Sequence, residues 1–285
     1  MNTFETGREL WLDAMEQCLR GEHRASRDGS THEVQGMSWR LENVEQAWIN
    51  DANRRAKLKY ACAEFIWYLS GTRDGWIKHY APQYKRFLEP DGSAHGAYGS
   101  RWMEHGQMGF VLGELKSDSR RAVMTCWDAH HDIPQVVREG PDVPCTLSLQ
   151  FLREDDRLNM VVTMRSNDAW LGLPYDMFCF ATLQRLFAGA LGLRTGWYTH
   201  QVGSMHLYER NVARAEECLQ HRASGIGYQE PLSGMIPDSP TALLDEMAAV
   251  VMIEMKYRMF GDGLKHAVLP ANSLLRNVVA HTIGN

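Results

Sequence analysis

The sequence offers one cysteine in a setting where a thiol could act on a substrate. Cys145 follows Pro144 in the segment DVPCTLSLQF, at the entrance to an expected strand, where a side chain can face a cleft. A thiolate nucleophile needs positive charge nearby to lower its pKa, and Arg165, Arg120 and Arg121 are the candidates. Because cysteine is among the most buried residue types, a structural role for Cys145 is the alternative.

A second group of polar residues lies in the segment MRSNDAWLGLPYD, residues 164–176. Arg165 and Ser166 supply a guanidinium fork and a hydroxyl donor at a strand end, a combination that suits phosphate oxygens. A surface arginine beside a turn serine is the alternative. A helix is expected to begin near Tyr175, and Asp176 in its first turn could simply interact with the helix dipole.

The elements that must position these residues can be predicted from the pattern of apolar side chains. Apolar residues at three- and four-residue spacing predict helices over 5–20 and 55–70, and a further helix after Pro174. Alternating or β-rich segments predict three strands, at 146–151, 158–166 and 197–208. Strands interspersed with helices, without a regular βαβ rhythm, favour an α+β fold in which helices cover a sheet.

Composition limits the classes of function. A chain of 285 residues with 44% hydrophobic and 23% charged residues can bury one large core, and because it lacks repeats and linkers we expect a single domain over 1–285. A net charge of −5 argues against a broad nucleic-acid surface. No apolar run is long enough for a membrane helix, and the first ten residues carry charges where a signal peptide would be apolar. We therefore expect a cytoplasmic protein without membrane or nucleic-acid partners.

The six cysteines are widely spread, with no CxxC pair and no short Cys/His ladder. Reduced thiols and no metal cofactor are therefore expected.

The order and spacing of several motifs resemble those of the thymidylate synthase family. That family's RSxDxxLGxPFN stretch resembles residues 165–176, and its catalytic cysteine follows a proline before a QF strand, as Cys145 does. Its SRR, ELLWFLxG, YGxxWR and GDxHxY motifs resemble Ser119–Arg121, Glu64–Gly71, Tyr98–Trp102 and Gly203–Tyr208. The resemblance runs from about Arg27 to Asn211. It implies a large mixed sheet covered by helices, and a homodimer formed through that sheet.

The resemblance also implies roles for individual residues. The implied catalytic residues are Cys145, Glu64, Asp176 and Tyr98. Those implied for the nucleotide are Arg27, Arg120, Arg121, Arg165, Ser166, Asn167, His206 and Tyr208. Arg120 and Arg121 would reach the phosphate in the partner subunit. Those implied for the folate are Asp168, Tyr84 and Gly172.

Two of these assignments have a physical argument of their own. His206 and Tyr208 are two apart on a strand and so share a face, where they would contact the sugar hydroxyl; a pair of half-buried strand residues is the alternative. Glu64 would organise proton transfers through water, and a helical glutamate among apolar neighbours is costly to bury without a partner.

Departures from the family pattern indicate the base. Asp176 stands where thymidylate synthases have the asparagine of PFN, which donates to the C4 carbonyl of uracil and accepts from N3–H. Cytosine presents an amino donor at C4 and a bare N3 acceptor, so a carboxyl group fits it better. Ser204 replaces the aspartate of GDxHxY, and the strings MRSND and VGSxHxY resemble phage deoxycytidylate hydroxymethylases. A helix-start carboxylate in an ordinary synthase is the alternative reading of Asp176.

The implied reaction is the 5-hydroxymethylation of dCMP or CMP with 5,10-methylenetetrahydrofolate. Cys145 would add to C6, C5 would take up the one-carbon unit, and water would replace hydride in the last step. Tyr84 occupies the position where the family commonly has a pocket tryptophan, and Phe87 replaces a second tryptophan nearby. The hydroxyl of Tyr84 could position the water that an indole would exclude. The alternatives are a synthase or hydroxymethylase acting on a uracil nucleotide, and a nucleotide-binding protein without turnover.

The resemblance fails over residues 212–285, where we find no counterpart to the family's GYxPHP-like stretch. The preference between ribose and deoxyribose therefore stays open. Residues 240–260 predict an added helix, whose apolar stripe would belong to the core or to a dimer contact.

Overall fold

A mixed sheet of seven strands lies at the centre of the computed structural model, which describes residues 1–227, 232–261, 269–270 and 273–284. The strand order is β1-β3-β7-β6-β5-β4, and β2 pairs with β3 beside this path. The strands are β1 (Asn2–Phe4), β2 (Glu22–Ser26), β3 (Gly29–Leu41), β4 (Val123–Thr125), β5 (Thr146–Glu154), β6 (Arg157–Asp168) and β7 (Arg194–Tyr208). The three predicted strands are β5, β6 and β7, and the predicted α+β class is confirmed.

The connections between strands explain which pairs are parallel. β2 and β3, and likewise β5 and β6, are antiparallel neighbours joined by two-residue turns at 27–28 and 155–156. β6 and β7 are parallel, which requires a crossover, and the helix α6 (Leu173–Ala190) provides it. As a result the end of β6, its loop and the start of α6 lie beside the end of β7.

The predicted helices at the N-terminal side are α1 (Gly7–Arg20) and α2 (Leu58–Leu69). α6 begins at Leu173, earlier than expected, because Pro174 fits its first turn. The other α-helices are α3 (Tyr98–Met103), α4 (Gln107–Glu114), α5 (Ala129–Val137), α7 (Val212–Gln220), α8 (Pro240–Phe260) and α9 (Leu274–Ile283). No helix in the described ranges is long and apolar enough to span a bilayer.

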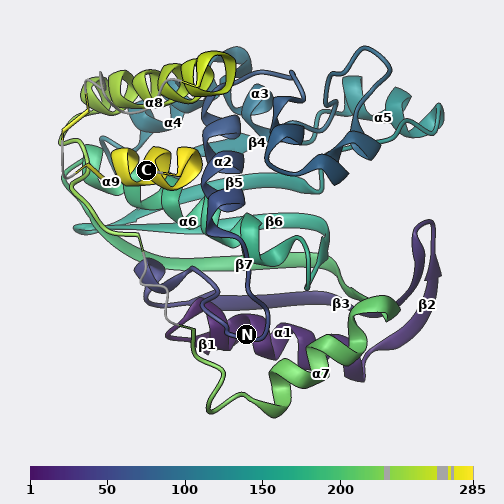
Figure 1. The fold of residues 1–285 in the computed structure, drawn as a ribbon. Helices are drawn as coiled ribbons and strands as arrows, with labels where there is room; N and C mark the ends of the chain where they lie inside the picture. Colours follow the sequence, from purple (N-terminus) through teal and green to yellow (C-terminus); the bar gives the residue numbers. More distant parts are fainter. Residues whose placement is uncertain (228–231, 262–268, 271–272, 285) are drawn as a thin grey trace.

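The core lies between the sheet and the helices that cover it. α6 is buried on nearly all sides because it packs between β6, β7 and α2. Figure 1 shows α8 and α9 next to α2 at one end of the molecule, and α1 and α7 at the other end, beside β1 and β3.

The predicted stripe on α8 is divided between core and surface. Leu243, Met247 and Val250 are buried, whereas Leu244 and Met255 are exposed. The first three therefore belong to the core, and the other two lie on the surface of this single chain.

Candidate active site

The sheet brings Cys145 and Arg165 together, as the sequence predicted. Cys145 directly precedes β5, and its carbonyl oxygen accepts a hydrogen bond of 2.9 Å from the backbone nitrogen of Arg165 on β6. The guanidinium of Arg165 then turns back, with Nη2 3.5 Å from the Cys145 sulfur and Nε 2.9 Å from the carbonyl oxygen of Pro144. All six cysteines lie in the described part of the chain, and Cys145 alone is not buried.

The predicted lowering of the Cys145 pKa is wrong in sign. Burial raises the pKa of the thiol to about 11, and the charge of Asp142 raises it as well. Arg165 and Arg27 lower the pKa, as predicted, but the loss of solvation outweighs them. Sequence reasoning underestimated this desolvation, because a strand entrance does not reveal how deep its side chains lie.

Asp142 is a site residue that the sequence analysis missed. Its Oδ2 accepts a hydrogen bond of 3.0 Å from the backbone nitrogen of Gly96, and burial raises the pKa of its carboxyl to about 6. A Cβ at Gly96 would lie 2.5 Å from Oδ2, so glycine is needed for this approach. Only its position three residues before Cys145 could have drawn attention to it.

The cations predicted for the phosphate divide into two sets. Arg27 lies at the tip of the β2–β3 hairpin, and its charge acts on both Cys145 and Asp142. Arg120 and Arg121 are exposed and precede β4. Arg121 pairs with Glu114 at 3.0 Å, and no hydrogen bond or ion pair among the described residues joins Arg121 to the cysteine.

Ser166, His206 and Tyr208 form one cluster, as their predicted strand positions imply. The Ser166 hydroxyl lies 3.4 Å from Nδ1 of His206, and the His206 and Tyr208 rings meet edge to face at 5.3 Å. The guanidinium of Arg210 lies over the Tyr208 ring at 3.9 Å and donates to the carbonyl oxygen of Asp28 in the hairpin turn, at 3.0 Å. This cluster thus adjoins the loop that carries Arg27.

Glu64 is buried in the middle of α2 with a hydrogen-bond partner. The hydroxyl of Tyr60 donates to its Oε1 at 2.7 Å. Burial raises the pKa of Glu64 to about 7, although hydrogen bonds from Tyr60 and Tyr68 lower it. Such a carboxyl can take up and release a proton near neutral pH. Tyr60 and Tyr68 were not predicted, although their four-residue spacing from Glu64 places all three on one helix face.

Asp176 is buried in the first turn of α6, beside Asn167 at the end of β6. The amide Nδ2 of Asn167 donates to Asp176 Oδ2 at 3.0 Å. Burial raises the pKa of Asp176 well above its ordinary value, and the charge of Glu64 adds to this. A Cβ at Gly172 would lie 2.8 Å from Asn167 Oδ1, so glycine permits this packing. Asn167 is itself buried, and its direct contact with substrate stays a prediction.

Two predicted tyrosines line the same region. The ring of Tyr98 is stacked on Phe180 at 6.1 Å, and after burial the charges of Asp176 and Cys145 raise its pKa further. The ring of Tyr84 contacts Trp67 at 5.3 Å and Phe87 at 5.4 Å. The pKa of Tyr84 is raised by burial and then by Asp142, Glu64 and Cys145. Both hydroxyls therefore stay protonated at neutral pH.

Asp168 is the last residue of β6, and two backbone groups donate hydrogen bonds to one oxygen of its carboxylate. Its Oδ1 accepts hydrogen bonds from the backbone nitrogens of Trp170 at 2.7 Å and Leu171 at 3.0 Å, and burial raises its pKa. Both of these hydrogen bonds go to Oδ1, and neither uses the second oxygen, Oδ2. A carboxylate oxygen suits the N–H groups of a pterin ring, so the donor chemistry fits a folate here.

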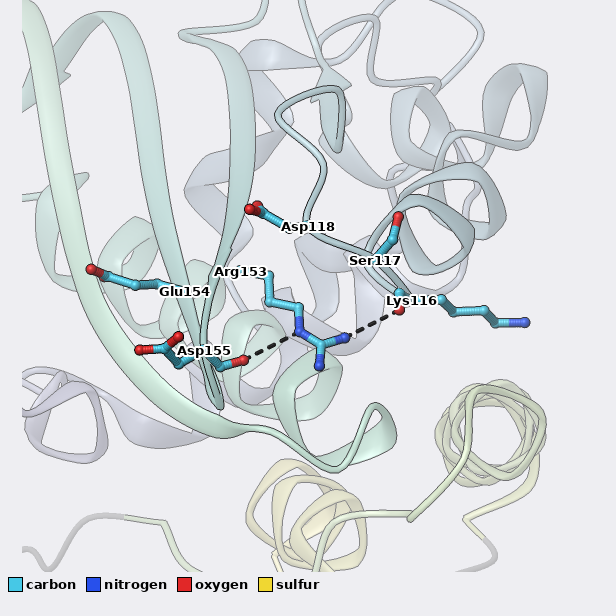
Figure 2. A pocket seen from close by; sticks show the side chains of 6 residues that line it. All are labelled: Lys116, Ser117, Asp118, Arg153, Glu154 and Asp155. Carbon is cyan, nitrogen blue, oxygen red and sulfur yellow. Dashed lines mark hydrogen bonds between the residues drawn. The ribbon is translucent and has the colours of Figure 1, made fainter.

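A separate surface hollow has no part in this site. It encloses about 460 Å³ and is lined by Lys116, Ser117, Asp118, Arg153, Glu154 and Asp155. Figure 2 shows the Arg153 guanidinium directed at backbone oxygens on both sides, those of Asp155 at 3.3 Å and Lys116 at 3.2 Å. Because this cation already joins the β5–β6 turn to the end of α4, the hollow is explained as a structural feature.

Comparisons with known proteins agree with the motifs. A family model described as thymidylate synthase matches residues 9–227. The chain is also similar to the deoxyuridylate hydroxymethyltransferase of Pseudomonas phage M6, with 32% identity over 198 residues. That match covers 66% of this chain and 56% of the phage protein, so the chain spans little more than half of the length of that relative.

Proposed function

Because the chain belongs to the thymidylate synthase family, we propose that it is a pyrimidine nucleotide 5-hydroxymethyltransferase acting on dCMP or CMP. The cosubstrate would be 5,10-methylenetetrahydrofolate. The observation that carries this proposal is a half-buried thiol beside a guanidinium, in electrostatic reach of a buried carboxyl at the base-reading position.

Cys145 serves as the nucleophile that adds to C6 of the pyrimidine. Its pKa of about 11 means that the thiol must lose its proton during attack. Asp142, whose pKa is about 6 and whose charge acts on the thiol, would accept this proton, and Arg165 at 3.5 Å stabilises the thiolate as it forms. The addition makes C5 electron-rich, which prepares this carbon to take up the one-carbon unit. The other five cysteines are buried and cannot play this part.

Asp176 reads the Watson–Crick edge of the base. Burial raises its pKa well above the ordinary value of an aspartate, which favours the protonated form, and that form has one oxygen that accepts and one hydroxyl that donates. The accepting oxygen suits the amino group of cytosine, and the hydroxyl suits N3. Asn167 donates to Oδ2, which as a carbonyl oxygen can accept a second hydrogen bond, from the amino group, while Oδ1 can carry the hydroxyl.

Arg27, Arg165 and Ser166 hold the phosphate, while His206 and Tyr208 hold the sugar. Within one chain Arg120 and Arg121 are exposed, and Arg121 pairs with Glu114, so the role proposed for them uses a homodimer in which each subunit lends these cations to the other. A dianion beside several guanidinium groups gains strongly from such an arrangement.

Glu64 and Tyr84 support the final step, in which water adds to the activated C5 substituent. The Glu64 pKa of about 7 allows it to accept the proton of that water. Tyr84 presents a neutral hydroxyl near the same charges, which can orient the water molecule. The folate supplies the one-carbon unit, and Asp168 with Gly172 would hold its pterin ring.

A uracil nucleotide is the second candidate substrate, favoured by the name of the phage M6 relative. A neutral carboxyl can also serve uracil if its hydroxyl points to O4 and its other oxygen accepts from N3–H. The two candidates thus differ in the position of one proton on Asp176.

The proposal is tested by incubating the protein with methylenetetrahydrofolate and dCMP, CMP, dUMP or UMP, each separately. Mass spectrometry should find a 5-hydroxymethyl cytosine nucleotide and free tetrahydrofolate. A 5-hydroxymethyl or 5-methyl uracil nucleotide as the main product would favour the second candidate. Binding of all four nucleotides without any product would indicate a nucleotide-binding protein without turnover.

A further inference from the structure

We infer that a buried relay behind Asp176 fixes which of its two oxygens carries the proton. The relay consists of Tyr198, His200 and Asn167, of which the first two had no part in the sequence analysis. The inference rests on the base selection proposed above, because it explains how one carboxyl could distinguish two bases.

The contacts form an unbroken path through the core. The hydroxyl of Tyr198 lies 2.6 Å from Nδ1 of His200, and Nε2 of His200 lies 3.4 Å from the amide Nδ2 of Asn167. The same Nδ2 lies 3.0 Å from Asp176 Oδ2. Tyr198 and His200 have no exposed surface, and Asn167 is 3% exposed, so water does not compete for these groups.

One tautomer of His200 accounts for all of these contacts. Burial lowers the pKa of His200 to about 3, so its ring is neutral and carries one N–H. When Nδ1–H donates to the Tyr198 oxygen, Nε2 is left as an acceptor for the Asn167 amide. The second amide hydrogen lies between Asp176 Oδ2, at 3.0 Å from Nδ2, and the sulfur of Met164, at 2.8 Å.

This orientation places the carboxyl proton of Asp176. An oxygen that accepts from Asn167 favours the carbonyl form, so the proton resides on Oδ1. Without the relay the proton could occupy either oxygen, and the carboxyl would match cytosine in one state and uracil in the other.

The test compares cytosine and uracil nucleotides in three variants. Tyr198→Phe removes the hydroxyl that fixes the tautomer of His200. Asn167→Ala removes the amide that donates to Asp176. Each should lower the ratio of kcat/KM for dCMP over dUMP on the order of fivefold, the loss expected for one hydrogen bond. Tyr80→Phe is the matched control, since it removes a tyrosine hydroxyl that binds Glu254 at 3.0 Å, and its ratio should not change.

Asp176→Asn separates this inference from the proposed function. If that substitution leaves the base ratio unaltered, the proposed function fails. Melting temperatures show whether Tyr198→Phe and Asn167→Ala are folded. If Asp176→Asn changes the ratio of kcat/KM but these two folded variants keep the wild-type ratio, only the relay is refuted.

An independent observation points to a cation site on the β2–β3 hairpin. We propose that His23, His32 and Glu209 bind a divalent transition-metal ion such as Zn²⁺. Nε2 of His32 lies 3.0 Å and Nε2 of His23 lies 3.7 Å from the same oxygen, Oε2 of Glu209. The three ligand atoms all lie within 4.8 Å of one another.

The sheet holds these ligands at suitable spacing. His23 and His32 are direct partners across β2 and β3, and Leu207, two residues before Glu209, is the partner of His32 on β7. A tetrahedral zinc ion with bonds of about 2.1 Å keeps neighbouring ligand atoms about 3.4 Å apart, and the two separations from Glu209, 3.0 and 3.7 Å, lie on either side of this value.

A bound ion would fasten the hairpin to the segment after β7. Each residue of β2 is exposed, so this strand is attached by its pairing with β3 and not by core contacts. Figure 1 shows the hairpin projecting at one side of the sheet. Because Arg27 lies at its tip, the cation would order a predicted phosphate-binding loop.

Zinc binding can be measured by calorimetry on chelator-treated protein carrying Cys145→Ser, which removes the accessible thiol as a competing ligand. One ion should bind per chain, and His23→Ala or His32→Ala should weaken binding at least about tenfold. His131→Ala, which removes another exposed histidine beside a carboxylate, Asp128 at 2.9 Å, is the control.

Hydrogen exchange provides the second readout. Zinc should slow amide exchange in β2 in the parent protein but not in His32→Ala. Absence of saturable binding, or binding that is equally strong in both hairpin variants, would overturn the proposal.

Discussion

The guanidinium Nη2 of Arg165 lies 3.5 Å from the sulfur of Cys145, and the backbones of the two residues are also hydrogen-bonded. One residue therefore both fixes the position of the thiol and supplies the nearest cation. This arrangement opposes the effect of burial, which nevertheless raises the pKa of Cys145 to about 11.

Arg165→Gln should raise the pKa of the Cys145 thiol further. The rate of Cys145 alkylation by iodoacetamide, followed by mass spectrometry between pH 7 and 9, should fall about tenfold, which corresponds to one pKa unit. Arg194→Gln should leave this rate unchanged, because the Arg194 side chain pairs with Asp156 and has no part in the proposed site. Equal rates in wild type and Arg165→Gln would contradict the role of Arg165.

Asp176→Asn should shift the preference from cytosine to uracil. An amide whose nitrogen faces C4 donates to O4 and accepts from N3–H of uracil. With cytosine the same orientation sets its nitrogen against the amino donor and its oxygen against the N3 acceptor. The ratio of kcat/KM for dCMP over dUMP should fall at least about a hundredfold. Survival of the cytosine preference in this variant would disprove the assignment of Asp176.

Glu64 should make stability depend on pH. Its pKa is about 7 in the folded protein but 4.5 in the absence of burial, so between these values the folded state retains a proton that the unfolded state has lost. Stability contributed by this group is therefore present below pH 4.5 and lost as pH rises through 7. The difference in unfolding free energy between Glu64→Gln and wild type should therefore shift in favour of the variant by up to about 3 kcal/mol from pH 5 to pH 8.

Urea unfolding of both proteins at these two pH values checks this prediction. A difference between variant and wild type that is the same at pH 5 and pH 8 would show that Glu64 does not retain its proton.

Subunit exchange should reveal whether Arg120 and Arg121 act across a dimer. The double variant Arg120→Ala, Arg121→Ala and the variant Cys145→Ala should each lack activity. Mixing them under conditions that allow exchange should restore about a quarter of wild-type activity, because half of the dimers are mixed and each contains one intact site. No recovery, with exchange verified by native mass spectrometry, would place these arginines in their own subunit or outside the site.

The sequence predicted the scaffold of the site because that part depends on local patterns. Strand alternation located β5 and β6, and Pro144 and Cys145 mark the start of β5, so the meeting of Cys145 with Arg165 could be anticipated. The same alternation placed His206 and Tyr208 on one face.

The remaining features depend on depth and on long-range packing. The spacing around Cys145 gives no measure of its desolvation, so the direction of its pKa shift was predicted wrongly. Asp142 and His200 acquire their roles only when a loop and a distant strand are packed against the site. Their side chains carry no motif that would separate them from other aspartates and histidines.

The central claim is that Cys145 bonds to C6 of a cytosine nucleotide chosen by Asp176. Its most direct test is intact-mass and peptide analysis after incubation with methylenetetrahydrofolate and 5-fluoro-dCMP, because fluorine cannot leave C5 as a cation and the adduct persists. We predict a complex of protein, nucleotide and folate attached at Cys145, formed faster than with 5-fluoro-dUMP and absent in Cys145→Ala. An adduct at another residue, no adduct at all, or one that forms only with the uracil analogue would contradict the account.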